Sequence, residues 1–310
     1  MYFIRGGVIA MSVFVLVYVA LSLLVGAGWR ALHRDRRRVS SATAYGFRIL
    51  PLVAAIVVVA LFTVPSFLRF EPRWDDEPIG IAALALASAG AAILIFGIVK
   101  ALLAWIQTSR CVSSWTSDSR TLNLETAVPA FQTPESAPLL AVAGLCRPKL
   151  LISGCARRLL DPGELEAAVR HELAHVRRRD NLKKLLLRAC AFPFLDALDR
   201  AWLEAAEINA DDEAVQDERS ALDLASALLK VSRLAPRVRG PELAMDLVSG
   251  APGAVTARVE WLLSWTPQAR PRRRLIPIGV PAALVAAVAA GLAYMWVLAR
   301  VHQFTELLVR

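Results

Sequence analysis

The chain is 310 residues long, 56% of its residues are hydrophobic, and its mean hydropathy is +0.48. This composition is too apolar for one ordinary water-soluble domain, and the length is sufficient for a membrane region together with a compact soluble domain. The formal net charge of +9 does not indicate a nucleic-acid-binding protein, because residues 107–274 are nearly balanced, with 24 basic and 21 acidic side chains, and most of the excess is arginine beside apolar segments.

Four long uncharged runs predict four transmembrane helices. Each run is long enough for a helix to cross about 30 Å of hydrocarbon. The first exceeds the apolar part of a cleavable signal peptide, about 7 to 15 residues, so we expect it to remain as a membrane helix. We expect the helices at about 6–28, 49–68, 78–100 and 275–299, with a membrane region over 1–106 and a short tail over 300–310.

The charges of the short loops predict the orientation. Residues 29–48 hold six arginines against Asp35, whereas residues 69–78 hold two arginines against four acidic side chains. Arginine-rich short loops stay in the cytoplasm, so we expect the amino terminus outside, residues 107–274 in the cytoplasm and the tail outside. The four cysteines form no paired CxxC spacing, and in a reducing cytoplasm we interpret them as small core residues.

Two short apolar runs, 139–142 and 149–152, open the regular part of the soluble stretch and predict a hairpin or a pair of strands. Two interpretations stay open: the runs only cover the core, or one is an edge strand that pairs with an extended substrate backbone. After them, Asp161-Pro162-Gly163-Glu164 predicts the start of a helix, with a capping carboxylate, proline at the first helical position and an acidic first turn.

This helix carries His171-Glu172-Leu173-Ala174-His175, which includes two of the four histidines of the chain. Positions four apart lie on one helix face, so both imidazoles can reach one metal ion while Glu172 addresses the water bound to it. On the other side, apolar residues recur at helical spacing, so we expect the histidine side to face a cleft. The apolar residues are Leu165, Val169, Leu173 and Val176.

A catalytic zinc site has three protein ligands and one water, so a third ligand is needed. His33 and His302 fall in the first loop and the outer tail, which leaves a carboxylate as the expected ligand. Glu207 and Asp211 are four apart on the helical segment predicted over 196–217, so one can bind metal while the other accepts a hydrogen bond from an imidazole. From spacing alone, the alternative of a solvated acidic face stays open for the acids of this segment: Glu204, Glu207, Asp211, Asp212 and Glu213.

Two further features leave alternatives open. The apolar segment 185–198, which contains Phe192-Pro193-Phe194, is too short to span a membrane and is either a core helix or a membrane-surface turn. Residues 107–274 contain no tyrosine and no third histidine, so the donor for a reaction oxyanion is Arg178, Arg219, Asn209 or a backbone N–H group.

Several motifs together resemble a known family. They are Arg147-Pro148, Glu164-Leu165, the His171–His175 motif, Arg178, Asp180-Asn181-Leu182 and Glu207-Ile208-Asn209-Ala210-Asp211. Over about residues 128–266 this pattern resembles the membrane-embedded metallopeptidases of the BlaR/MecR type, the bacterial β-lactam sensor-transducers. More distantly it resembles the HtpX and CAAX prenyl-protease group, which shares HExxH followed by ExxxD.

The resemblance implies a mainly α membrane protein of four transmembrane helices, with an α+β zincin-like metallopeptidase domain over 107–274 inserted between helices three and four. It implies a multi-pass protein of the bacterial cytoplasmic (inner) membrane with the catalytic domain facing the cytoplasm. It further implies Zn²⁺ as cofactor, His171, His175 and Glu207 as ligands, Asp211 as the hydrogen-bond partner of a ligand, and Glu172 as the general base for zinc-bound water.

The expected function is therefore that of a zinc endopeptidase acting on a cytoplasmic or membrane-proximal protein, with a transcriptional repressor in a signalling pathway as one candidate substrate. The alternatives are a quality-control protease for membrane proteins and a non-catalytic membrane scaffold or signal transducer that keeps the fold. The expected partners are a protein or peptide substrate and the lipid bilayer. The sensor-transducers continue into a large extracellular penicillin-binding domain, whereas this chain stops about ten residues after the fourth predicted span, so we do not expect direct β-lactam sensing.

Overall fold

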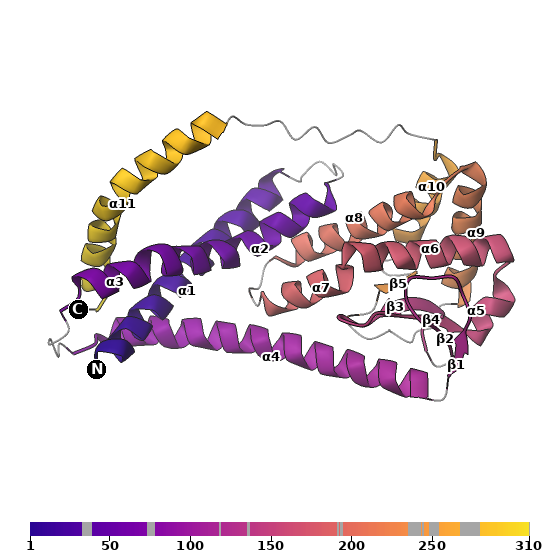
Figure 1. The fold of residues 1–310 in the computed structure, drawn as a ribbon, viewed down its shortest axis with the longest axis horizontal. Helices are drawn as coiled ribbons and strands as arrows, with labels where there is room; N and C mark the ends of the chain where they lie inside the picture. Colours follow the sequence, from indigo (N-terminus) through magenta and orange to yellow (C-terminus); the bar gives the residue numbers. More distant parts are fainter. Residues whose placement is uncertain are drawn as a thin grey trace.

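The computed structural model describes residues 1–32, 39–72, 78–117, 119–134, 137–190, 192, 195–234, 243, 245–247, 254–266 and 280–309. The molecule is elongated and mostly helical (Figure 1). Long helices form a bundle at one end, and a small mixed sheet with shorter helices lies at the other. The helix α4 (Ile81–Ser117) extends from the bundle to the sheet and so connects the two parts.

The bundle contains three helical stretches that are long and apolar enough to cross a membrane: Tyr2–Ala31, Ser41–Phe70 and Ile81–Ser117. They include the first two uncharged runs of the sequence and most of the third, whose helix begins at Ile81 and continues to Ser117. The elements of the bundle are α1 (Tyr2–Leu32), α2 (Ser41–Val58), the π-helix η1 (Val59–Thr63), α3 (Val64–Phe70), α4 (Ile81–Ser117) and α11 (Val280–Val309).

The predicted fourth span corresponds to α11 only in part, because residues 275–279 lie outside the described residues. In the described part of the chain α11 is not among the candidate spans, so the fourth span stays a prediction. The helix nevertheless packs against α3 and η1.

A proline explains how α11 is held. Pro65 has no N–H group, so it cannot donate to the carbonyl of Leu61 four residues earlier, and the helix widens into the π-turn η1 at this point. The hydroxyl group of Tyr294 on α11 donates to the Leu61 carbonyl instead. One turn further, Ser66 Oγ donates to the Leu298 carbonyl at 2.9 Å. Backbone groups of both helices thus find partners across the contact.

The sheet has the strand order β1-β2-β4-β3-β5, in which β2 and β4 are parallel and the other pairs antiparallel. The two apolar runs of the sequence form the β3–β4 hairpin, whose turn contains Gly144 with φ +106°. Neither strand is an edge of the described sheet, because β4 is flanked by β2 and β3 while β5 pairs with Ala141 and Val142 of β3. The strands are β1 (Arg120–Leu122), β2 (Ala130–Thr133), β3 (Leu140–Ala143), β4 (Lys149–Ser153) and β5 (Met245–Asp246).

Helices cover both faces of this sheet. On one face, alternate residues of β3 and β4 pack with α6, α9 and α10 in the main hydrophobic core, which includes the apolar side of α6 that the periodicity predicted. On the other face, Leu151 and Ala143 contact Val112 near the end of α4. The helices outside the bundle are α5 (Gly154–Leu159), α6 (Pro162–Arg178), α7 (Asp180–Ala189), α8 (Asp196–Ala214), α9 (Glu218–Leu234) and α10 (Ala254–Leu263).

The α7–α8 connection joins the two parts of the molecule. Phe192 lies against Tyr18 of α1, with the ring centroids 5.7 Å apart, and belongs to a cluster of bundle side chains. Leu195 and Trp202 pack with Trp29 of α1 in a second cluster. Segment 185–198 therefore includes the end of α7 and the start of α8, and its described apolar side chains pack in buried clusters against the bundle, whereas a membrane-surface position stays a prediction. Pro193 and Phe194 lie outside the described residues.

Candidate metal centre

The helix α6 positions both histidines of the motif. It begins as predicted, with a capping box in which the Asp161 N–H donates to Glu164 Oε2 at 2.9 Å and Pro162 is in the first turn. It ends at Arg179, whose φ of 55° is left-handed and turns the chain directly into α7. His171 and His175 therefore lie one turn apart on one face of a well-capped helix.

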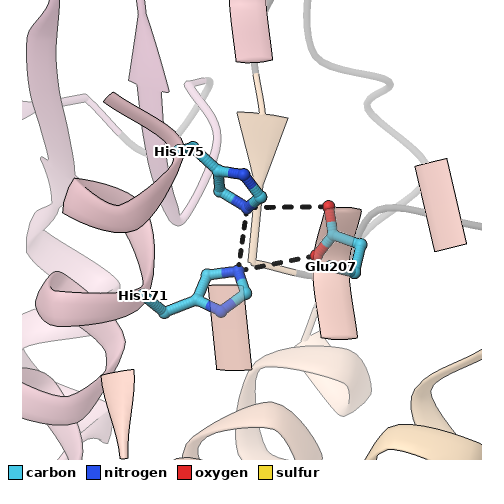
Figure 2. A group of neighbouring side chains, drawn as sticks. All are labelled: His171, His175 and Glu207. Atoms are coloured by element: carbon cyan, nitrogen blue, oxygen red, sulfur yellow. Dashed lines mark hydrogen bonds and ion pairs between the residues drawn. The ribbon is translucent and has the colours of Figure 1, made fainter. Parts of the chain in front are cut away.

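The imidazoles converge with one carboxylate of α8 (Figure 2). Nε2 of His171 and Nε2 of His175 are 3.2 Å apart. Glu207 faces them from α8, with Oε2 at 3.5 Å from His171 Nε2 and Oε1 at 3.7 Å from His175 Nε2. Segments that are more than 30 residues apart in the sequence thus bring three metal-binding groups together.

The remaining acids of α8 point elsewhere. Glu204 and Asp212 are exposed, and Glu213 pairs with Arg177 and Arg178. Glu207 and Asp211 are instead buried, with exposed fractions of 2% and 0%. The alternative of a solvated acidic face therefore holds for Glu204, Asp212 and Glu213. It fails for Glu207 and Asp211, the two acids that share a face by spacing.

A carboxylate fixes the orientation of each imidazole. Nδ1 of His171 lies 2.8 Å from Asp211 Oδ1, and Nδ1 of His175 lies 2.9 Å from Asp180 Oδ2. These contacts hold the rings so that both Nε2 atoms face Glu207, as in metal sites whose ligating histidines are supported by carboxylates. Asp211 was expected in such a role, whereas the role of Asp180 was missed. The left-handed residue that brings Asp180 back beside His175 has no recognisable sequence signal.

Arg258 of α10 is a second residue that sequence reasoning missed. Its guanidinium donates to Asp211 through Nε at 2.7 Å and Nη2 at 2.6 Å, and its Nη1 lies 3.0 Å from Glu207 Oε2. Nη1 also donates to the Leu247 carbonyl at 2.8 Å. A lone arginine 47 residues beyond Asp211 looks like a surface residue in the sequence, so only the packing of α10 reveals this contact.

The buried charges set the pKa values of the site. Burial by itself lowers the pKa of His171, but contacts with Asp211 and Glu207 outweigh burial and raise it to about 9. Burial dominates at His175 and lowers its pKa. Burial raises the pKa of Asp211, but Arg258 outweighs it and brings the value to about 2, and the same guanidinium lowers the pKa of Glu207. The surroundings of His171 therefore favour positive charge.

The donor set fits a divalent cation. Neither carboxylate oxygen of Glu207 accepts a hydrogen bond of regular geometry, although both are buried. Ligand atoms about 2.0 to 2.2 Å from a tetrahedral Zn²⁺ are about 3.3 to 3.6 Å from one another, close to the three separations found here. Four carboxylates are buried in or beside this group, and three of them lie against the cations of Arg258 and Lys183, so the site is rich in acidic groups of the kind that bind a divalent ion. The carboxylates are those of Glu172, Asp180, Glu207 and Asp211.

Glu172 lies between the two histidines on α6 and is fully buried. Its Oε2 accepts a hydrogen bond from the Val142 N–H of β3 at 2.9 Å, which fixes the carboxylate against the sheet. The histidine side of α6 does not face an open cleft as expected, because His171 and His175 are 0% and 1% exposed. A cavity of about 350 Å³ reaches His175 beside the β3–β4 turn.

The three side chains considered as oxyanion donors are turned elsewhere in this conformation. Arg178 Nε donates to Glu213 at 2.9 Å, Asn209 Nδ2 donates to Ser41 Oγ of α2 at 2.6 Å, and Arg219 is exposed. Of the expected donors to a reaction oxyanion, only the backbone N–H groups are not directed elsewhere in the described residues. The Asn209 contact links α8 to α2, which belongs to a candidate membrane span.

One family of known proteins matches this chain. The family model described as BlaR1 peptidase M56 matches residues 71–262. The matched region includes α4, the sheet and the helices α6 and α8 that carry the histidines and Glu207. A search of curated proteins found no match. Peptidases of this family are typically metal-dependent, in keeping with the His/Glu group found here. Because the match covers most of the chain, this protein belongs to the BlaR1 peptidase M56 family.

Proposed function

We propose that this protein is an integral-membrane zinc-dependent endopeptidase in which His171, His175 and Glu207 hold Zn²⁺ and Glu172 is the general base. The observation that supports this most strongly is the convergence of two imidazole Nε2 atoms and one buried carboxylate, with a further carboxylate on each imidazole. Membership of a peptidase family supports peptide-bond hydrolysis as the reaction.

Bound at this group, Zn²⁺ would supply Lewis-acid polarisation of water and of the scissile carbonyl, with a water pKa near about 7. Glu172 takes the proton of the attacking water and delivers it to the leaving amide nitrogen. The Val142 N–H holds the Glu172 carboxylate in place, so little reorientation is needed. Asp180 and Asp211 keep the imidazoles directed at the ion through their Nδ1 atoms.

Substrate must reach a site that is buried in this conformation. The cavity beside His175 reaches the site, and its wall includes Val142, Gly144 and Asn181. The amide of Asn181 donates to the carbonyl groups of Val142 and Gly144 at 3.2 Å each and fixes this wall. We assign this cavity to a side chain of the substrate next to the scissile bond.

The proposed topology has a membrane region over 1–106, the peptidase domain over 107–274, a fourth transmembrane helix over 275–299 and an outer tail over 300–310. The arginine-rich first loop supports a cytoplasmic peptidase domain in a bacterial inner membrane. Contacts of Tyr294 and Ser66 support α11 as a member of the bundle. The substrate is a cytoplasmic or membrane-proximal protein, and a transcriptional repressor fits the signalling role of the family.

The test is proteolysis by the purified full chain in lipid nanodiscs, with an unstructured protein as substrate. We expect Glu172→Gln to retain zinc and to lose cleavage, because the ligands remain and the base does not. Equal cleavage by both forms would exclude this mechanism, and absence of zinc from both would favour the non-catalytic scaffold.

The third ligand has a matched control on the same helix. Glu207→Ala should lose zinc in elemental analysis, whereas Glu204→Ala should keep it, because Glu204 is exposed one turn earlier on α8. Unchanged zinc content in Glu207→Ala would remove this residue from the ligand set. Comparing protein fragments in cells that carry the active form or Glu172→Gln would then identify the substrate and separate the signalling role from quality control.

A further inference from the structure

A second, larger cavity lies outside the metal centre, where the bundle meets the helices α7 and α8. Its volume is about 670 Å³, within the range of about 300 to 1,000 Å³ that small-molecule sites occupy. Its walls come from α2 and α4 on the bundle side and from α7, α8 and their connection on the other. We call it the junction cavity.

The junction cavity is strongly basic. Two acidic side chains, Asp196 and Asp199, also line it, and Asp199 is held by Arg48 at 2.8 Å. The net charge of its lining is therefore +3, from five basic and two acidic residues. The basic residues are Arg48, Lys100, Lys184, Arg188 and Arg200.

Its position along the bundle coincides with the end of the apolar zone. Arg48 precedes the uncharged run of α2, and Lys100 follows the uncharged run of α4. These two helices are candidate membrane spans, so the two cations mark the boundary between hydrocarbon and headgroups on the side of the sheet. In a bilayer crossed by α2 and α4, the cavity would lie at the depth of the phospholipid headgroups.

The walls combine these cations with apolar surface. Phe96 on the membrane side of Lys100 is 57% exposed, and the Lys100 ammonium lies 5.5 Å from its ring centroid. Phe192 and Trp202 form part of the opposite wall. A ligand that fits both features has an anionic head and an apolar chain that continues along the exposed face of α4.

We infer that the junction cavity binds the headgroup of an anionic phospholipid from the leaflet that faces the peptidase region. The charge complementarity favours a phosphate-bearing lipid of net negative charge over a zwitterionic one. The aromatic lining and the exposed α4 face favour a lipid over a free phosphate ester, because they would contact only the acyl part. The metal centre takes no part in this binding, so the inference does not depend on the proposed function.

The experiment is native mass spectrometry of the purified full chain in detergent micelles, titrated with phosphatidylglycerol, phosphatidylcholine or sn-glycerol 3-phosphate. We expect one tightly held phosphatidylglycerol and weaker binding of phosphatidylcholine. Each basic side chain near a membrane surface contributes about fivefold to the affinity for anionic lipid, so Lys100→Gln with Arg200→Gln should weaken binding about 30-fold.

The matched control is Arg110→Gln with Arg233→Gln, which removes the same charge from exposed positions of α4 and α9 outside the cavity. We expect this control to change the affinity less than about twofold. Equal weakening by both double variants would show diffuse attraction and overturn the site, as would equal affinity for the two lipids. Displacement of the lipid by sn-glycerol 3-phosphate at equal concentration would also overturn it, because a free phosphate ester would then be the ligand.

Discussion

The contact of Arg258 with the metal centre gives the most quantitative prediction. Arg258→Met keeps most of the side-chain volume and removes the charge and every hydrogen bond of the guanidinium. The carboxylates of Asp211 and Glu207 lose the guanidinium that faces them. All three side chains are buried, because Arg258, Asp211 and Glu207 are only 4%, 0% and 2% exposed. The Leu247 carbonyl loses its donor as well.

Removing one partner of a buried ion pair costs about 3 to 5 kcal/mol, because the other charge stays behind without compensation. In a domain of about 150 to 250 residues, each kcal/mol lowers Tm by about 2 to 4 °C. We therefore expect Arg258→Met to lower Tm by roughly 6 to 20 °C. Adding Asp211→Asn to Arg258→Met should restore part of this loss, because it removes one of the two carboxylate charges that Arg258 faces.

The assay is thermal unfolding of the metal-free protein in detergent, followed by tryptophan fluorescence. Arg177→Met is the matched control, because Arg177 also pairs with a carboxylate, that of Glu213, but is 51% exposed at its side chain. An exposed pair contributes about 0 to 1 kcal/mol, so the control should lose less than about 4 °C. If both variants lose the same few degrees, the reasoning about buried charge at this site is wrong.

Three further predictions concern other positions. Burial alone would raise the pKa of Glu164, but hydrogen bonds from Lys230, Ser226 and the Asp161 backbone outweigh it and hold the pKa below its ordinary 4.5. This stabilisation is therefore present above pH 4.5 and disappears as the pH falls through the lower pKa of the folded state. Glu164→Gln should lower the free energy of unfolding by about 1 kcal/mol at neutral pH and leave it unchanged in acid. Denaturation at several pH values measures this difference. Asp180→Asn should weaken zinc binding about 10- to 100-fold in chelator competition, because His175 loses its support, and an effect no larger than that of Lys183→Gln would count against this role. Gly144→Ala should destabilise the protein by about 1 to 3 kcal/mol, because φ is +106° and a Cβ would lie 2.8 Å from the Arg147 carbonyl oxygen. Denaturant titration measures this loss, and an unchanged unfolding midpoint would contradict it.

Local features of the fold could be predicted from the sequence because short-range rules govern them. The uncharged runs identify three helices that can span a membrane, since only uninterrupted apolar surface is stable in hydrocarbon. The start of α6 follows from its capping residues, and the shared face of His171 and His175 follows from the helical period. The same helical period predicts that Glu207 and Asp211 share one face of their helix.

The tertiary structure decided which groups meet. Spacing left five acids of α8 open, and the packing of α8 against α6 buries two of them beside the histidines. Asp180 reaches His175 through a left-handed turn, and Arg258 reaches Asp211 from 47 residues away. Strand order likewise placed β3 inside the sheet and not at its edge. Such contacts depend on how distant segments pack, so a local sequence pattern can place two side chains on one helix face but does not show which face is buried against another segment.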